Sequence, residues 1–184
     1  ISSSLPVKTE FFLQICLGQF PRFFFSPKLP KKSVEPLKRK WTLEFKNESV
    51  NDYAEFEKIL AHMVPRHIPT AYLEGYSELN KECLKAGWPK QPRVIFTGNA
   101  YMTDDIFKLW AAKCTENGSR LVIGQHGGHH GMTPFAFHEQ HQIDIADQWI
   151  SWGWSNESRS QVKPLGNFRA SRKQIKAKQS GGAL

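Results

Sequence analysis

The spacing of hydrophobic residues predicts two amphipathic helices in the first half of the chain. Apolar side chains recur at helical spacing from residue 51 or 52 to about 63, and again over 70–86. Pro65 and Pro69 should interrupt this pattern, because proline lacks the backbone N–H that continues a helix. Gly87 stands where a helix C-terminal glycine is expected. Residues 41–45 are compatible with a short strand, and the rest of 1–50 shows no regular period.

The second half alternates between short apolar runs and helical segments. Strands are predicted at 93–96, 121–123 and 148–151, with helices from 103 or 104 to about 116 and over 139–146. This order is typical of an α/β fold with a Rossmann-like parallel sheet covered on both faces. Ligands bind beyond the carboxyl ends of the strands in such sheets. We therefore expect the loops 97–102, 125–134 and 152–156 to face one crevice.

These patterns predict three parts. Residues 1–50 form an irregular basic and aromatic segment, 51–158 a Rossmann-like α/β domain with preceding helices, and 159–184 a basic linker. The region before the sheet is expected to be mainly helical. Residues 180–184 read as a turn that enters a strand, so we expect the chain to be an incomplete fragment whose linker enters a truncated second domain.

Composition excludes several classes of protein. With 40% hydrophobic residues and a mean hydropathy of −0.49, the chain can bury a core and remain water-soluble. Its three cysteines form no CxxC pair, which argues against a disulfide scaffold or a cysteine-based zinc site and favours a reducing compartment. The apolar stretch 11–25 is too short and too interrupted to cross a bilayer.

The net charge of +8 is unevenly distributed. Basic residues concentrate in the two flanks, 28–46 and 159–178, while the centre is mildly acidic. This pattern does not favour a specific nucleic-acid partner. The flanks could instead make peripheral contact with an anionic membrane. The expected location is the cytoplasm, with the inner face of the cell membrane as the place of such contact.

Histidines gather in the centre, with five of the seven between 126 and 141. Imidazole and carboxylate ligands suit zinc, iron or manganese. His129, His130 and His141 are therefore candidate metal ligands, and a metal-dependent hydrolase or metal-binding module is one alternative function. The order His138-Glu139-Gln140-His141 is one residue short of the HExxH zinc motif. The same pattern is also expected if these histidines are exposed loop residues that bind no ligand.

A glycine-rich loop follows the second predicted strand. Gly127, Gly128 and Gly131 allow close approach of a ligand to the backbone, although a tight turn needs such glycines too. His126 could exchange a proton near neutral pH or, when protonated, stabilise a phosphate. Trp152-Gly153-Trp154 offers either a stacking platform for a sugar or base, or simple packing. Thr97 and Asn99 are candidate hydroxyl and amide contacts.

Several segments in fixed order carry a family resemblance: Pro69-Thr70-Ala71-Tyr72-Leu73-Glu74-Gly75-Tyr76, Ile95-Phe96-Thr97-Gly98-Asn99-Ala100, Asp105-Ile106-Phe107-Lys108-Leu109-Trp110-Ala111-Ala112, Gly124-Gln125-His126-Gly127-Gly128, Glu139-Gln140-His141, Ile145-Ala146-Asp147 and Ser151-Trp152-Gly153-Trp154. Over about residues 62–170 the chain resembles a family of bacterial surface-carbohydrate transferases associated with lipopolysaccharide or capsule gene clusters. The resemblance implies a GT-B-like architecture of two Rossmann-type halves, of which this chain would hold the first. It implies a glycosyltransferase that moves sugar from a nucleotide-sugar donor to a surface glycan acceptor without a bound metal or cofactor.

The resemblance also assigns roles to residues. His126 is the candidate general base or charge-stabilising group, with Glu139 and His141 orienting it or contacting acceptor hydroxyls. Asp147 is expected to order the strand that follows it. Besides the glycosyltransferase and the metal-dependent alternative, a third possible function is a non-catalytic module that docks on membrane-bound glycan machinery. The candidate substrate-binding residues are Thr97, Asn99, Gln125, Gly127, Gly128, Trp152, Gly153 and Trp154.

Overall fold

The computed structural model describes residues 7–18, 27–44, 54–133 and 135–166. The chain divides into two compact units. The first, here called the sheet unit, comprises Ile1–Arg22, Val94–Asn99 and Arg120–Leu184, and the second, the helical unit, comprises Phe23–Arg93 and Ala100–Ser119. No helix in these described stretches has the length and apolarity needed to cross a membrane.

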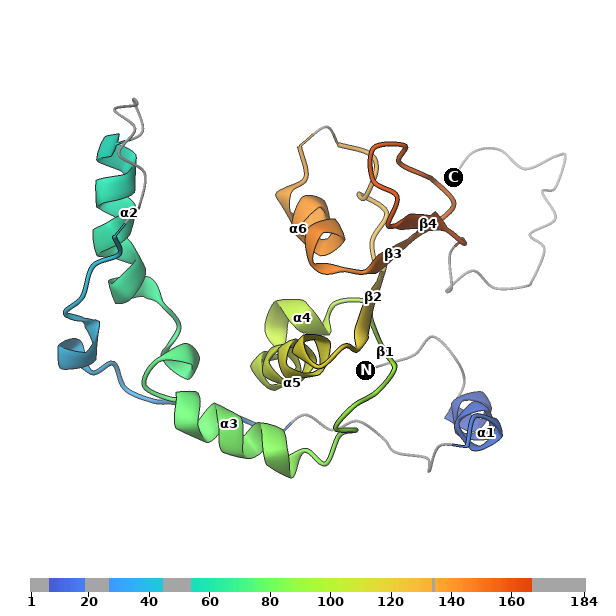
Figure 1. Cartoon of the computed structure of the whole chain (residues 1–184), viewed down its shortest axis with the longest axis horizontal. Coiled ribbons are helices and arrows are strands. Elements are labelled where there is room, and N and C mark those ends of the chain that lie inside the picture. The colour runs from blue at the N-terminus through green and yellow to red at the C-terminus, as the bar shows by residue number, and fades with distance from the viewer. Residues whose placement is uncertain (1–6, 19–26, 45–53, 134, 167–184) are drawn as a thin grey trace, which may run out of the picture. The chain divides into compact units, whose positions relative to one another are not determined.

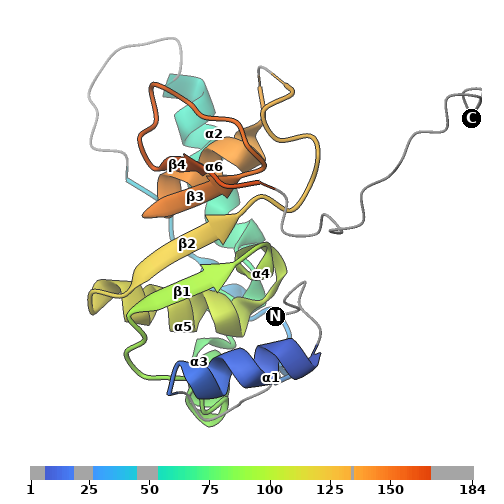
Figure 2. The ribbon, with the colours of Figure 1, turned by 90° about the vertical axis from the view of Figure 1, so that its right-hand side faces the viewer.

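The sheet unit is built on four parallel strands. They are β1 (Val94–Thr97), β2 (Arg120–Gly124), β3 (Gln148–Ser151) and β4 (Val162–Pro164), in the order β1-β2-β3-β4 (Figure 2). Ile95 pairs with Leu121, and Ile123 pairs with Trp149. The unit also contains α1 (Val7–Cys16) and, between β2 and β3, α6 (Phe137–Ile145). The predicted α/β class with a parallel sheet is confirmed.

Burial in the sheet differs from strand to strand. Ile123 in β2 is fully buried, and so are Trp149 and Ser151 in β3, with Ile150 between them almost completely buried. Phe96 in β1 is 48% exposed while its neighbour Ile95 is buried. The expectation of a sheet covered on both faces is therefore wrong for β1 within the described residues. Val94 is exposed as well, so the two residues that point to the same side of β1 both contact solvent, while Ile95 and Thr97 on the other side are buried.

Asp147 orders the sheet as expected. Its Oδ2 accepts a hydrogen bond from the Leu121 N–H at 2.7 Å, and its own N–H donates to the Leu121 carbonyl at 2.9 Å. One carboxylate thereby joins the chain just before β3 to the start of β2. The last strand of the sheet, β4, was not predicted, because its three residues Val162–Pro164 form no apolar run.

The described residues of the helical unit form the helices α2 (Ala54–His67), η2 (Thr70–Tyr72), α3 (Tyr76–Lys85), α4 (Ala100–Thr103) and α5 (Asp105–Glu116) (Figure 1). It also contains a short helix, η1 (Pro36–Arg39), in the segment expected to be irregular. Asp104 caps α5 by accepting from the Phe107 N–H at 2.9 Å, and α5 ends before Asn117, as predicted. Gly87 has the positive φ of 64° expected after α3.

Four local expectations are corrected. The helix predicted over 70–86 is two helices, because the Gly75 N–H turns back to the Thr70 carbonyl at 2.7 Å and α3 starts only at Tyr76. Leu84, one of the apolar residues of that predicted amphipathic helix, is not buried but 75% exposed. The helix α6 begins two residues earlier than expected, at Phe137. Residues 41–44 form no strand.

Pro65 does not end its helix, since α2 continues to His67. Proline has no N–H, so the carbonyl four residues earlier, on Ala61, loses its helical partner. The Leu43 N–H donates to that carbonyl at 3.4 Å. The helix therefore tolerates the proline because the segment 41–44, here called the strap, supplies the missing donor.

Candidate functional site

Three loops of the sheet unit meet at the carboxyl ends of β1, β2 and β3. A Cβ added to Gly98, after β1, would lie 3.7 Å from the Cβ of His126, after β2. The Trp152 N–H, after β3, donates to Oε1 of Gln125 at 2.8 Å. Of the loops 97–102, 125–134 and 152–156, the first residues thus lie together as expected, because parallel strands end at the same edge of the sheet. That the three loops face one crevice stays a prediction.

Gln125 is the centre of this arrangement. Its side chain is buried, and Oε1 accepts from both the Trp152 N–H and the Trp154 Nε1–H, the latter at 3.1 Å. Its Nε2 donates to the Gly127 carbonyl at 2.8 Å. Its own carbonyl accepts from the Trp152 indole at 3.0 Å. The amide expected to bind substrate is therefore occupied by protein groups, and its role is to join the two loops.

His130 supports the loop from the interior of the sheet unit. It is 2% exposed, and its Nδ1 lies 3.0 Å from the Gly127 carbonyl, which can only accept, so Nδ1 carries the proton. Its ring lies 4.0 Å from the His129 ring and 5.5 Å from Trp149. Burial lowers the pKa of His130, and the bond to Gly127 opposes this only in part. At neutral pH it is an uncharged support.

His126 lies at the edge of the site. Its side chain is half-buried, and its ring meets that of His130 edge to face, at a centroid distance of 5.1 Å and an angle of 68°. It is therefore neither enclosed in the hydrophobic core nor fully in water.

The glycines of the loop have different surroundings. A Cβ on Gly131, whose φ is 75°, would come within 2.9 Å of the Trp154 ring, so this position requires glycine. A Cβ on Gly127 would come within 2.9 Å of His129 Nδ1, but the exposed side chain of His129 can move away. A Cβ on Gly128 or Gly153 would meet no described atom within 4 Å. Gly128 and Gly153 therefore border the open side of the site, where a ligand can approach the backbone.

The remaining predicted residues are placed as follows. Glu139 accepts from the Gly131 N–H at 2.6 Å and so anchors the loop to α6. His141 is exposed on the same helix, near Asp144, whose pKa is lowered by hydrogen bonds from Gln140 and Arg159. Thr97 is 1% exposed, which puts its hydroxyl out of reach of a ligand, whereas Asn99 is exposed.

The histidine cluster does not form a metal centre within the described residues. No three histidine, cysteine, aspartate or glutamate side chains of those residues converge on a common point. His129 and His130 stack with their planes tilted by 33°, and Nδ1 of His130 is used by the Gly127 carbonyl. The geometry thus gives no support to the alternative ligand set of His129, His130 and His141.

The supporting role of His130 and the joining role of Gln125 were not foreseen from the sequence. Both depend on which polar atoms face each other after folding. The sequence suggested either a metal-ligand set or exposed loop histidines, and the burial of His130 shows that the second interpretation is wrong for this residue.

A family model described as LIC12162 family transferase matches residues 1–184, the whole chain. No curated protein matches the chain significantly, and neither does any solved structure.

Proposed function

The chain belongs to the LIC12162 family of transferases, and on that premise we propose that it serves glycosyl transfer from a nucleotide-sugar donor to the precursor of a bacterial surface polysaccharide. The acceptor hydroxyl oxygen forms the new bond to the anomeric carbon. The bond from that carbon to the diphosphate breaks, and the nucleoside diphosphate leaves with the electron pair. The acceptor's proton passes to the imidazole of His126.

One observation carries the proposal: Gln125 joins the His126 loop and the Trp152-Gly153-Trp154 turn into one site at the carboxyl edge of the parallel sheet. This edge is where α/β sheets bind ligands. Both indole N–H groups are held by Gln125, which fixes the orientation of the two tryptophans. Aromatic faces held in this way suit the apolar face of a sugar ring.

The roles of the other residues follow from their contacts. His126 acts as the base, and Gly128 and Gly153 leave room for the substrate. Asn99, exposed at the end of β1, contacts a substrate hydroxyl. Gln125, Glu139 and His130 are positioning residues, because each holds the loop through a backbone atom of Gly127 or Gly131.

The test is the rate of nucleoside diphosphate release by the full-length protein, with a panel of nucleotide sugars and a lipid-linked or free glycan acceptor. His126→Ala should lower the rate by about 10²–10⁴-fold, the usual effect of removing a general base. His138→Ala is the matched control, since His138 is exposed on α6 and has no place in the site.

The two variants together separate catalysis from folding. Both should unfold at the temperature of the wild type, because neither side chain is enclosed in the core. A rate for His126→Ala close to that of His138→Ala would remove His126 from the mechanism.

A further inference from the structure

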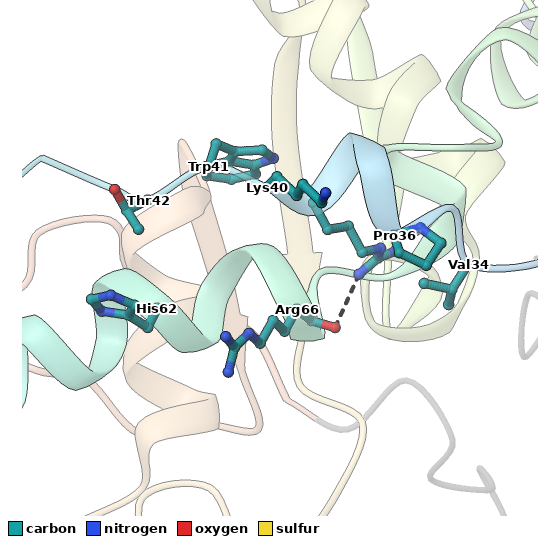
Figure 3. Close-up of a pocket in the computed structure, with 8 residues that line it drawn as sticks. Val34, Pro36, Lys40, Trp41, Thr42, His62 and Arg66 are labelled. Atoms are coloured by element: carbon teal, nitrogen blue, oxygen red, sulfur yellow. Dashed lines mark hydrogen bonds between the residues drawn. The ribbon is translucent and has the colours of Figure 1, made fainter.

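The helical unit contains an open pocket of about 470 Å³ that none of the preceding roles uses. It lies between the segment 34–42 and the C-terminal half of α2 (Figure 3). Its volume falls within the range of about 300–1,000 Å³ typical of small-molecule sites. The residues that line it include Arg39, Lys40, Trp41, Thr42, His62 and Arg66, and no acidic side chain is among the lining residues.

A buried ion pair fixes one wall of this pocket. Arg39 is bound by both carboxylate oxygens of Glu74, each at 2.7 Å. Its Nη1 donates to the carbonyls of Pro65, Arg66 and Ile68 at the end of α2. Glu74 neutralises the charge of Arg39, and the three carbonyls accept hydrogen bonds from Nη1 of Arg39. Arg39 therefore holds the wall in place and is not available to a ligand.

The strap fixes a second part of the pocket wall. The Leu43 N–H is bonded to the Ala61 carbonyl that Pro65 leaves without a helical donor. The Trp41 indole N–H donates to the Lys38 carbonyl at 2.9 Å. The ring of Trp41 is therefore oriented by its only polar atom and presents carbon surface; it remains 38% exposed.

Four polar side chains of the pocket are left to interact with a ligand. Within the described residues, neither Lys40 nor Arg66 has an ion-pair partner. His62 Nδ1 lies 2.8 Å from the Lys58 carbonyl and so carries a proton, which leaves Nε2 to pair with a hydroxyl group of a ligand. The hydroxyl of Thr42 both donates and accepts.

We propose that this pocket binds a sugar ring carrying an anionic group, with the anion on Lys40 and Arg66 and the ring on Trp41. Two cations that have no ion-pair partner among the described residues suit a phosphate or carboxylate. A fixed indole face selects a ring with apolar C–H surface. His62 and Thr42 pair with hydroxyl groups. A free phosphate ion would use only the first of these features, and a neutral sugar only the last two.

This site does not depend on the proposed transfer reaction, because its residues belong to the helical unit and its test measures binding alone. Isothermal titration calorimetry of the purified protein uses four probes: glucose 1-phosphate, glucuronic acid, glucose and inorganic phosphate. The first two distinguish a phosphate from a carboxylate as the anionic group. We expect at least one of them to bind about tenfold more tightly than either glucose or inorganic phosphate, and to weaken as salt is added.

Variants assign the binding to this pocket. Lys40→Gln and Arg66→Gln should each weaken the anionic sugar about tenfold, the usual effect of losing a charged hydrogen bond at a partly screened site. Trp41→Ala should lower its affinity to that of inorganic phosphate, while Trp41→Phe, which keeps an aromatic face, retains binding. Lys81→Gln is the control, since Lys81 is an exposed cation of α3 outside the pocket.

Three results would overturn the proposal. Inorganic phosphate binding as tightly as glucose 1-phosphate would indicate an adventitious ion only. Glucose binding as tightly as the anionic sugars would exclude a role for Lys40 and Arg66. Absence of heat with both anionic sugars up to about 10 mM, where even weak specific sites fill, would show that the pocket does not bind this class.

Discussion

At the scale of single residues, Gln125 has the most consequential contacts in the sheet unit. Five hydrogen-bonding groups converge on it: two N–H groups on its Oε1, the Gly127 carbonyl on its Nε2, the Trp152 indole on its carbonyl, and the Ile150 carbonyl on its N–H at 2.8 Å. A glutamine is required, because one end of the side chain must accept while the other donates.

Gln125→Glu tests this requirement. The substitution keeps the accepting oxygen but turns the Nε2 donor into a second acceptor facing the Gly127 carbonyl. The buried donor bond is lost and two acceptors oppose each other, so we expect a loss of about 1–3 kcal/mol in the free energy of unfolding. Urea denaturation measures it.

The control for this substitution is Gln91→Glu, which makes the same chemical change at an exposed position. It should leave the unfolding free energy within about 0.5 kcal/mol of the wild type. Equal stabilities of the Gln125 and Gln91 variants would show that the amide does not hold the two loops together.

At the scale of elements, the loop between β2 and α6 is shaped by glycine, imidazole and indole packing. Gly131 combines a φ of 75° with a close approach to Trp154, whose ring a Cβ would reach at 2.9 Å. The Trp154 ring in turn lies 5.1 Å from that of buried Trp149. Trp154 has little room to move away, since its other contacts hold it.

Gly131→Ala should therefore be more destabilising than backbone strain alone explains. Gly118 after α5 supplies the comparison, because its φ of 91° is also positive but a Cβ there meets no described atom within 4 Å. Gly118→Ala should cost about 1 kcal/mol for the left-handed backbone. Gly131→Ala adds a clash of about 1–3 kcal/mol, as in overpacked cores.

Thermal unfolding of the two glycine variants side by side separates these contributions. A lower Tm for Gly131→Ala than for Gly118→Ala is the expected order. The opposite order, or equal values, would mean that Trp154 yields without cost and does not define the loop.

At the scale of the whole molecule, stability in acid should depend on the Arg39–Glu74 pair. The hydrogen bonds from Arg39 are the main reason that the pKa of Glu74 falls from 4.5 to about 2. A carboxyl group whose pKa is lower in the folded state stabilises the fold above its unfolded pKa. This stabilisation is complete above pH 4.5 and is lost as the pH falls toward about 2.

The Tm of the wild type should accordingly fall steeply over that interval. Glu74→Gln removes the titrating group and leaves Arg39 buried without a counter-ion. The variant should have a lower Tm at pH 7 and a shallower decline in acid. Glu82→Gln is the control, since Glu82 pairs with Lys85 at the surface. Parallel pH curves for wild type and Glu74→Gln would contradict this account.

Much of the fold could be predicted because its signals are local. The strands at 94–97, 120–124 and 148–151, the Asp104 cap and the glycine after α3 each depend on residues within one turn or one strand. Their common edge follows from parallel topology alone. This is why the meeting of the three loops was predictable although the contacts between them were not.

What escaped prediction depends on bonds between distant residues. The pairing of Arg39 with Glu74 spans 35 positions, and that of Gln125 with Trp154 spans 29. No periodicity reports such pairs. The continuation of α2 beyond Pro65 likewise depends on a hydrogen bond from the Leu43 N–H, which lies outside the helix. The sheet edge at which the three loops meet was therefore predicted from the sequence, while the contacts of Gln125, His130 and Glu139 at that edge came from the structure.

The most direct test of the central claim is the initial rate of sugar transfer by His126→Ala in the full-length protein, at saturating donor and acceptor. The account predicts a rate at least about a hundredfold below that of the wild type, with an unchanged unfolding temperature. A folded variant that transfers sugar within twofold of the wild-type rate would contradict it.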